Sequence, residues 1–171
     1  MGGRALFILA LIAATPAASA IRQFSYDPAD AETRAAAGSL TFLVNQRMFS
    51  TRVLKMRATE AKATADLKPA NPSLIGRAGA RANERDVYEV LPAEDGAALI
   101  AAFCPGSRRA WMAFSPVRLN QDLSVLVIGD DPKGGGAHRC RALTFNFHGE
   151  WRAPPGSPPP LGEVGPPRFP N

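Results

Sequence analysis

The sequence predicts an α+β protein: a single small domain with a mostly antiparallel sheet of about six strands, one main helix packed on one face, and one disulfide. Three observations lead to this prediction. Short stretches in which apolar and polar residues alternate, as in half-buried strands, recur between residues 40 and 152. One stretch, 92–103, places apolar residues at helical spacing. The two cysteines, Cys104 and Cys140, stand at the end of that helix and the start of the last strand.

The amino terminus has the order of a secretory signal peptide. Arg4 precedes an apolar run over 5–14, and Ala18, Ser19 and Ala20 have the small-residue pattern of a cleavage site. The run is shorter than the roughly 20 residues that cross a bilayer. We therefore expect 1–20 to be removed after Ala20, leaving a periplasmic or secreted protein with no transmembrane segment.

The mature chain divides into a globular domain, 21–152, and a tail, 153–171. The tail is rich in proline, which cannot pair in a sheet, so we expect it to be disordered. The domain begins with a short helix over 27–38, which Asp27 caps and Gly38 ends.

Alternating residues predict the strands that follow this helix. In chain order they are 40–46, 52–58, 62–68, 86–91, 110–115, 123–128 and 139–152. The composition of 58–66 would also suit a helix, and the strand is the preferred interpretation. Residues 69–85 show no period and contain prolines and glycines, so we expect a loop with one helical turn. A hairpin loop is expected over 130–136.

An even number of cysteines in an exported chain predicts a disulfide between Cys104 and Cys140. A catalytic thiolate is the competing interpretation. It is disfavoured because Cys104 follows a helix C-terminus, where the helix dipole raises the free energy of an anion. Separate or intermolecular thiols are a third alternative.

The last strand carries the candidate catalytic residues. Its polar face would present Thr144, Asn146, His148, Glu150 and Arg152. Residues two apart on a strand lie side by side, so His148 and Glu150 could form an acid–base pair or two metal ligands. A solvated strand face explains the same pattern.

Two further patterns are candidate binding sites. His138 and Cys140 form an H-x-C pair, but zinc sites need three or four such groups, so no metal and no cofactor is predicted. Arg77, Arg81 and Arg85 are spaced by four and would form a cationic ridge on a helix, or a solvated loop otherwise. They and Asn146 are the candidate ligand-binding residues.

The favoured function is a non-enzymatic envelope protein that binds an unknown partner or ligand. The net charge of +5 is modest, which allows weak contact with anionic envelope components and gives no reason to expect nucleic acid. The alternative function is a small hydrolase that uses His148 and Glu150.

Overall fold

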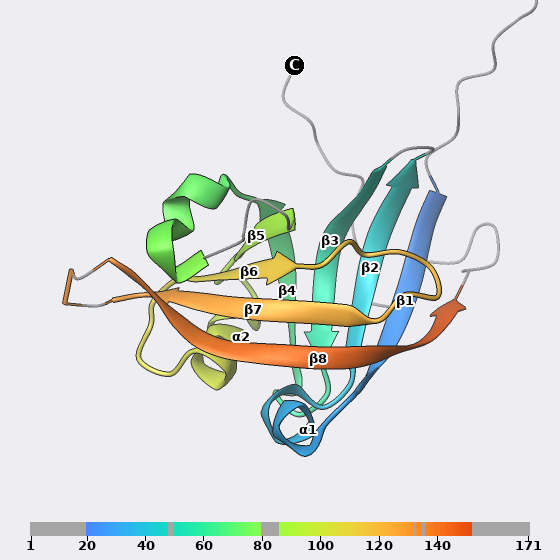
Figure 1. The fold of residues 1–171 in the computed structure, drawn as a ribbon, viewed down its shortest axis with the longest axis horizontal. Helices are drawn as coiled ribbons and strands as arrows, with labels where there is room; N and C mark the ends of the chain where they lie inside the picture. The colour runs from blue at the N-terminus through green and yellow to red at the C-terminus, as the bar shows by residue number, and fades with distance from the viewer. Residues whose placement is uncertain (1–19, 48–49, 80–85, 132, 135, 152–171) are drawn as a thin grey trace, which may run out of the picture.

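The protein is a closed barrel of eight antiparallel strands in sequential order (Figure 1). The computed structural model describes residues 20–47, 50–79, 86–131, 133–134 and 136–151. The strands are β1 (Ala20–Pro28), β2 (Leu40–Arg47), β3 (Ser50–Ala58), β4 (Ala63–Pro69), β5 (Asp86–Val90), β6 (Ala110–Phe114), β7 (Leu123–Asp130) and β8 (Ala137–Trp151). The helices are α1 (Ala31–Ala37), the 3₁₀ helix η1 (Pro72–Gly79) and α2 (Gly96–Phe103).

The prediction of an α+β fold with about six strands is wrong, because eight strands close into a barrel and the helices are short. The strand that the sequence analysis did not predict is β1. β1 pairs with β2 along one edge and with β8 along the other, which closes the sheet. The sequence predicts no element over 21–26 and a helix that begins at Asp27. In the structure Phe24 and Tyr26, two residues apart on β1, are both fully buried, as expected for the inward face of a strand.

Apolar side chains from opposite walls meet inside the barrel. Phe42 on β2 contacts Tyr26 on β1 at 5.7 Å between ring centroids and Phe114 on β6 at 5.2 Å, both edge to face. Strands β2 and β6 are separated by three strands in either direction around the barrel. The contact between Phe42 and Phe114 therefore spans the interior, which is part of the hydrophobic core.

Both α-helices cover the same end of the barrel. In an up-and-down barrel, the β1–β2 and β5–β6 connections lie at one end, and these connections contain α1 and α2. Leu99, Ile100 and Phe103 of α2 are buried and belong to the interior core. The predicted main helix therefore closes a barrel end and does not lie on a sheet face. Within the described residues, neither α-helix has the length and apolar character to cross a membrane.

The first helix begins later than the sequence predicts, because Asp30 caps it. Asp30 accepts hydrogen bonds from the backbone N–H of Thr33 at 2.7 Å and from the hydroxyl of Thr144 at 2.6 Å. These hydrogen bonds lower the pKa of Asp30 below its usual value, and the bond from Thr144 has the largest effect. The cap thereby ties α1 to β8. Gly38 ends the helix as predicted, with a φ of 63°.

A second, smaller core lies outside the barrel under η1. Ile75 is fully buried against the outward side chains of β5, β6 and β7, which are Val87, Trp111, Ala113, Leu126 and Ile128. The sequence prediction of a loop with one helical turn over 69–85 missed this anchor, and 80–85 lie outside the described residues. The strand preference for 58–66 is confirmed, because β3 ends at Ala58 and β4 begins at Ala63.

Candidate functional site

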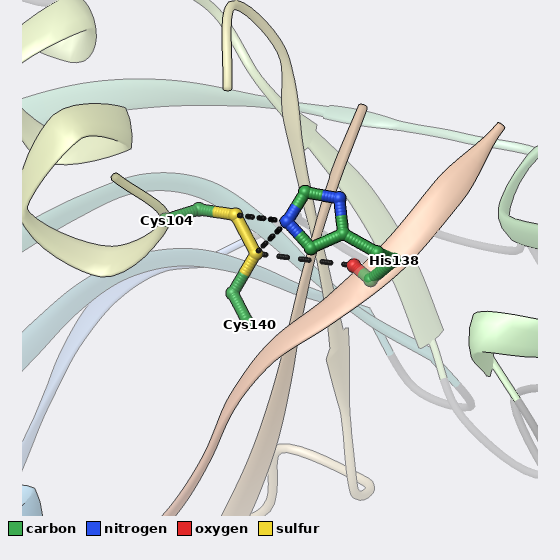
Figure 2. Close-up of side chains that lie close together, drawn as sticks. All are labelled: Cys104, His138 and Cys140. Atoms are coloured by element: carbon green, nitrogen blue, oxygen red, sulfur yellow. Dashed lines mark hydrogen bonds between the residues drawn. A yellow bond between two sulfur atoms is a disulfide. The ribbon is translucent and has the colours of Figure 1, made fainter. Parts of the chain in front are cut away.

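The predicted disulfide between Cys104 and Cys140 is present, with a Cα–Cα distance of 5.2 Å (Figure 2). This separation lies within the range of about 4.4 to 6.8 Å that disulfides occupy. Cys104 directly follows α2 and Cys140 lies near the start of β8. The bond therefore fastens the helix that closes the barrel end to the last strand, as the sequence predicts.

His138 lies against this disulfide. Its Nε2 atom is 3.5 Å from Sγ of Cys140 and 3.8 Å from Sγ of Cys104 (Figure 2). The three side-chain atoms that could bind a metal all lie within 4.8 Å of one another. Cys104 is buried, Cys140 is half-buried and His138 is exposed. We call these residues the Cys–His cluster; solvent reaches it from the histidine side.

Spacing could not reveal this cluster. The H-x-C pair of His138 and Cys140 is visible in the sequence, but the third member, Cys104, precedes His138 by 34 residues. Only the approach of α2 to β8 brings the three together.

The segment after Cys104 is held in place by Asp130 at the end of β7. The backbone N–H groups of Arg108 and Arg109 both donate to Oδ1 of Asp130 at 2.8 Å. Ser107 donates its hydroxyl to the backbone oxygen of Asp130 at 2.9 Å and lies 3.2 Å from Sγ of Cys104. Burial acts to raise the pKa of Asp130, but the backbone hydrogen bonds outweigh it and hold the pKa below its usual value. Asp130 thus fixes Ser107, and the hydroxyl of Ser107 lies against the sulfur of Cys104.

Gly129 lies directly under the cluster, and its lack of a side chain is what allows the close approach. A Cβ atom added there would overlap Sγ of Cys104 and the hydroxyl of Ser107. Any other residue at 129 would require Cys104 and Ser107 to shift.

His148 and Glu150 bind different partners. Nδ1 of His148 is 2.7 Å from a carboxylate oxygen of Asp27, and Glu150 forms an ion pair with Arg22 at 3.1 Å. A β-bulge on β8 separates them, because Ser25 pairs with Gly149 while the next residue of β1 pairs with Phe147. The extra residue reverses the alternation, so Glu150 is paired with Phe24, which faces the interior.

Asp27, which sequence reasoning assigned to a helix cap, joins His148 to Ser39. The hydroxyl of Ser39 donates to the second carboxylate oxygen of Asp27 at 3.0 Å. In this order the carboxylate stands between the hydroxyl and the imidazole. Hydrolytic triads place the histidine in the middle, so that it can take the proton of the hydroxyl. His148 and Asp27 are also largely exposed, at 57% and 53% of their side chains.

The remaining candidates are dispersed. Asn146 is exposed on β8. Thr144 is engaged with Asp30. Arg77 belongs to η1, but its side chain is not among those described, and Arg81, Arg85 and Arg152 lie outside the described residues.

A hollow that the sequence did not predict lies at the barrel end opposite the two α-helices. Its volume is about 770 Å³. Its lining residues are Gln46, Arg47, Ser50, Thr51, Asp86, Pro116, Val117, Arg118, Leu119 and Gln121. They come from β2, β3, β5 and the β6–β7 connection, which are distant in the sequence and meet only because the sheet closes. No protein-family model, curated protein or solved structure matches this chain.

Proposed function

We propose that this protein is a non-enzymatic binding module whose ligand occupies the hollow at the end of the barrel. The observation that carries the proposal is the hollow itself. Its volume of about 770 Å³ lies within the roughly 300–1,000 Å³ typical of small-molecule sites. A closed barrel with a packed interior is a rigid support for such a site, because every strand is hydrogen-bonded on both sides.

The lining favours a small molecule with an apolar body and an anionic group. Arg47 and Arg118 supply two guanidinium groups that can bind a carboxylate, sulfonate or phosphate, and Asp86 supplies one opposing charge. Leu119, which is 41% exposed, supplies apolar surface beside Arg118. Weak contact of the positively charged chain with anionic envelope components is compatible with this proposal.

Binding of the fluorescent anion anilinonaphthalene sulfonate tests the proposal. We expect a saturable rise in fluorescence with one site per chain. Arg118→Ala should weaken binding by about tenfold to a hundredfold, because it removes a charged hydrogen-bond donor worth about 1.5–3 kcal/mol.

Arg139→Ala is the matched control, because Arg139 is an exposed arginine on β8 that does not line the hollow. It should leave the dissociation constant unchanged. Equal affinity of the Arg118→Ala and Arg139→Ala proteins for the dye, with equal melting temperatures, would argue against the hollow as the site.

The geometry gives the hydrolase alternative no support, since His148 and Glu150 engage Asp27 and Arg22 instead of a common point. The binding module therefore accounts better for the described residues.

We also propose that the protein acts in the periplasm or is secreted, which the disulfide supports because such bonds persist mainly in oxidising compartments. Cleavage after Ala20 would leave nearly all of β1, including the inward residues Phe24 and Tyr26. We expect the intact mass of the exported protein to match a chain that begins at Ile21. A mature mass that retains 1–20 would contradict the export proposal.

A further inference from the structure

We propose that the Cys–His cluster is a redox-gated binding site for a thiophilic closed-shell cation, Zn(II) or Cu(I). When the disulfide is intact, its sulfurs are bonded to each other. When it is reduced, the thiolates of Cys104 and Cys140 and the imidazole of His138 provide two sulfur ligands and one nitrogen ligand. Soft thiolate sulfur selects these cations over hard ones such as Mg²⁺ and Ca²⁺.

The distances to His138 already fit a metal site. With metal–sulfur bonds of about 2.3 Å and metal–nitrogen bonds of about 2.0–2.1 Å, tetrahedral to trigonal angles separate sulfur from nitrogen by about 3.5 to 3.8 Å. The structure has 3.5 Å from Nε2 to Sγ of Cys140 and 3.8 Å to Sγ of Cys104. Only the separation of the two sulfurs has to increase after reduction, to about 3.8–4.0 Å on the same geometry.

The burial of the three ligands suits entry of an ion from solvent. Cys104 is the buried member of the cluster, whereas His138 is exposed to solvent. Three ligands satisfy the low coordination number of Cu(I). They leave Zn(II) one position for water, as in zinc sites with three protein ligands.

Both steps balance chemically. A dithiol reductant gives two electrons and two protons to the Cys104–Cys140 disulfide and is itself oxidised to a disulfide. Binding of Zn(II) then displaces two protons from the two thiols, and Cu(I) does the same. The disulfide and the metal thus compete for the same sulfurs.

Co(II) is a spectroscopic probe for the zinc site. The full-length protein is reduced with a phosphine, freed of reductant under nitrogen and titrated with Co(II), then with Zn(II). We expect one Co(II) per chain, with sulfur-to-cobalt charge transfer and the visible bands of tetrahedral cobalt, displaced by one equivalent of Zn(II). The oxidised protein should give no such bands. Cu(I) is tested separately by competition with bicinchoninate.

His138→Ala separates the cluster from a simple pair of thiols. This substitution should weaken binding of Zn(II) or Cu(I), whichever binds more tightly, by at least about a hundredfold. Loss of a residue that only hydrogen-bonds to a metal ligand already weakens metal binding by about 10–100-fold. His148→Ala is the matched control, since it removes the other histidine of β8, which pairs with Asp27. It should bind like the wild-type protein.

Two results would overturn the proposal. One is that the reduced protein binds neither Co(II), Zn(II) nor Cu(I) with one ion per chain. The other is that His138→Ala and His148→Ala bind alike. If reduction alone unfolds the barrel, near-ultraviolet circular dichroism gives the answer: Zn(II) or Cu(I) must restore the folded signal in the wild type and fail to do so in His138→Ala.

Discussion

Replacement of both Cys104 and Cys140 by alanine is expected to lower the free energy of unfolding by about 2–5 kcal/mol. The bond closes a loop across a sequence separation of 36, for which loss of chain entropy in the unfolded state accounts for roughly 4 kcal/mol. It also fastens α2 over the barrel end, where Leu99 and Phe103 belong to the core. Urea denaturation followed by circular dichroism measures the change.

The wild-type protein reduced in the presence of a chelator is the control for this prediction. It keeps both sulfurs in the core and loses only the bond. Equal loss of stability in the reduced protein and the double variant would assign the effect to the cross-link, and a loss confined to the variant would assign it to packing of the buried Cys104. A change below about 1 kcal/mol in both would contradict the prediction.

Phe42→Ala is expected to lower the free energy of unfolding by about 3–5 kcal/mol, the range for large buried aromatic side chains. Phe42 is fully buried, and its ring touches Tyr26 and Phe114 on other strands. The hydrogen-bonded wall of a closed barrel restricts its collapse around the vacated space, so we expect a value in the upper part of this range. Urea denaturation again provides the measurement.

Trp151→Ala is the matched aromatic control. Trp151 lies at the end of β8 with 62% of its surface exposed, so its removal should change stability by no more than about 0.5 kcal/mol. If Phe42→Ala were equally mild, the interior of the barrel would be less tightly packed than the ring contacts indicate.

Local patterns predicted the individual strands, but they could not predict that the sheet closes. Several strands, such as β4, bury one face and alternate in sequence, whereas β6 and β7 are buried on both faces because η1 covers their outward side. The disulfide followed from the count of cysteines. β1 was missed because Ala20 was assigned to the signal peptide and Asp27 to a helix cap. Its pairing with β8 depends on contacts between opposite ends of the domain, which no local window contains.

The candidate site shows the same division. A one-residue bulge in β8 separated Glu150 from His148, and alternation alone assumes that no bulge occurs. The sequence indicated only part of the Cys–His cluster, because His138 and Cys140 are close in sequence and Cys104 is not. The hollow could not be predicted from the sequence, because its lining residues come from segments that are distant along the chain.

From the pairing of β1 with β8 we expect the barrel to close late when the chain folds. Hairpins such as β2–β3 or β7–β8 join neighbouring segments and can form early, whereas the closing ladder joins Phe24 to Glu150 and Tyr26 to Phe147. Until β8 is available to pair, β1 has one edge without a partner, and the core next to Phe24 and Tyr26 is open on that side. The domain therefore completes its fold only when nearly its whole length is present. A chain that crosses a membrane unfolded, amino terminus first, would meet this condition on the far side.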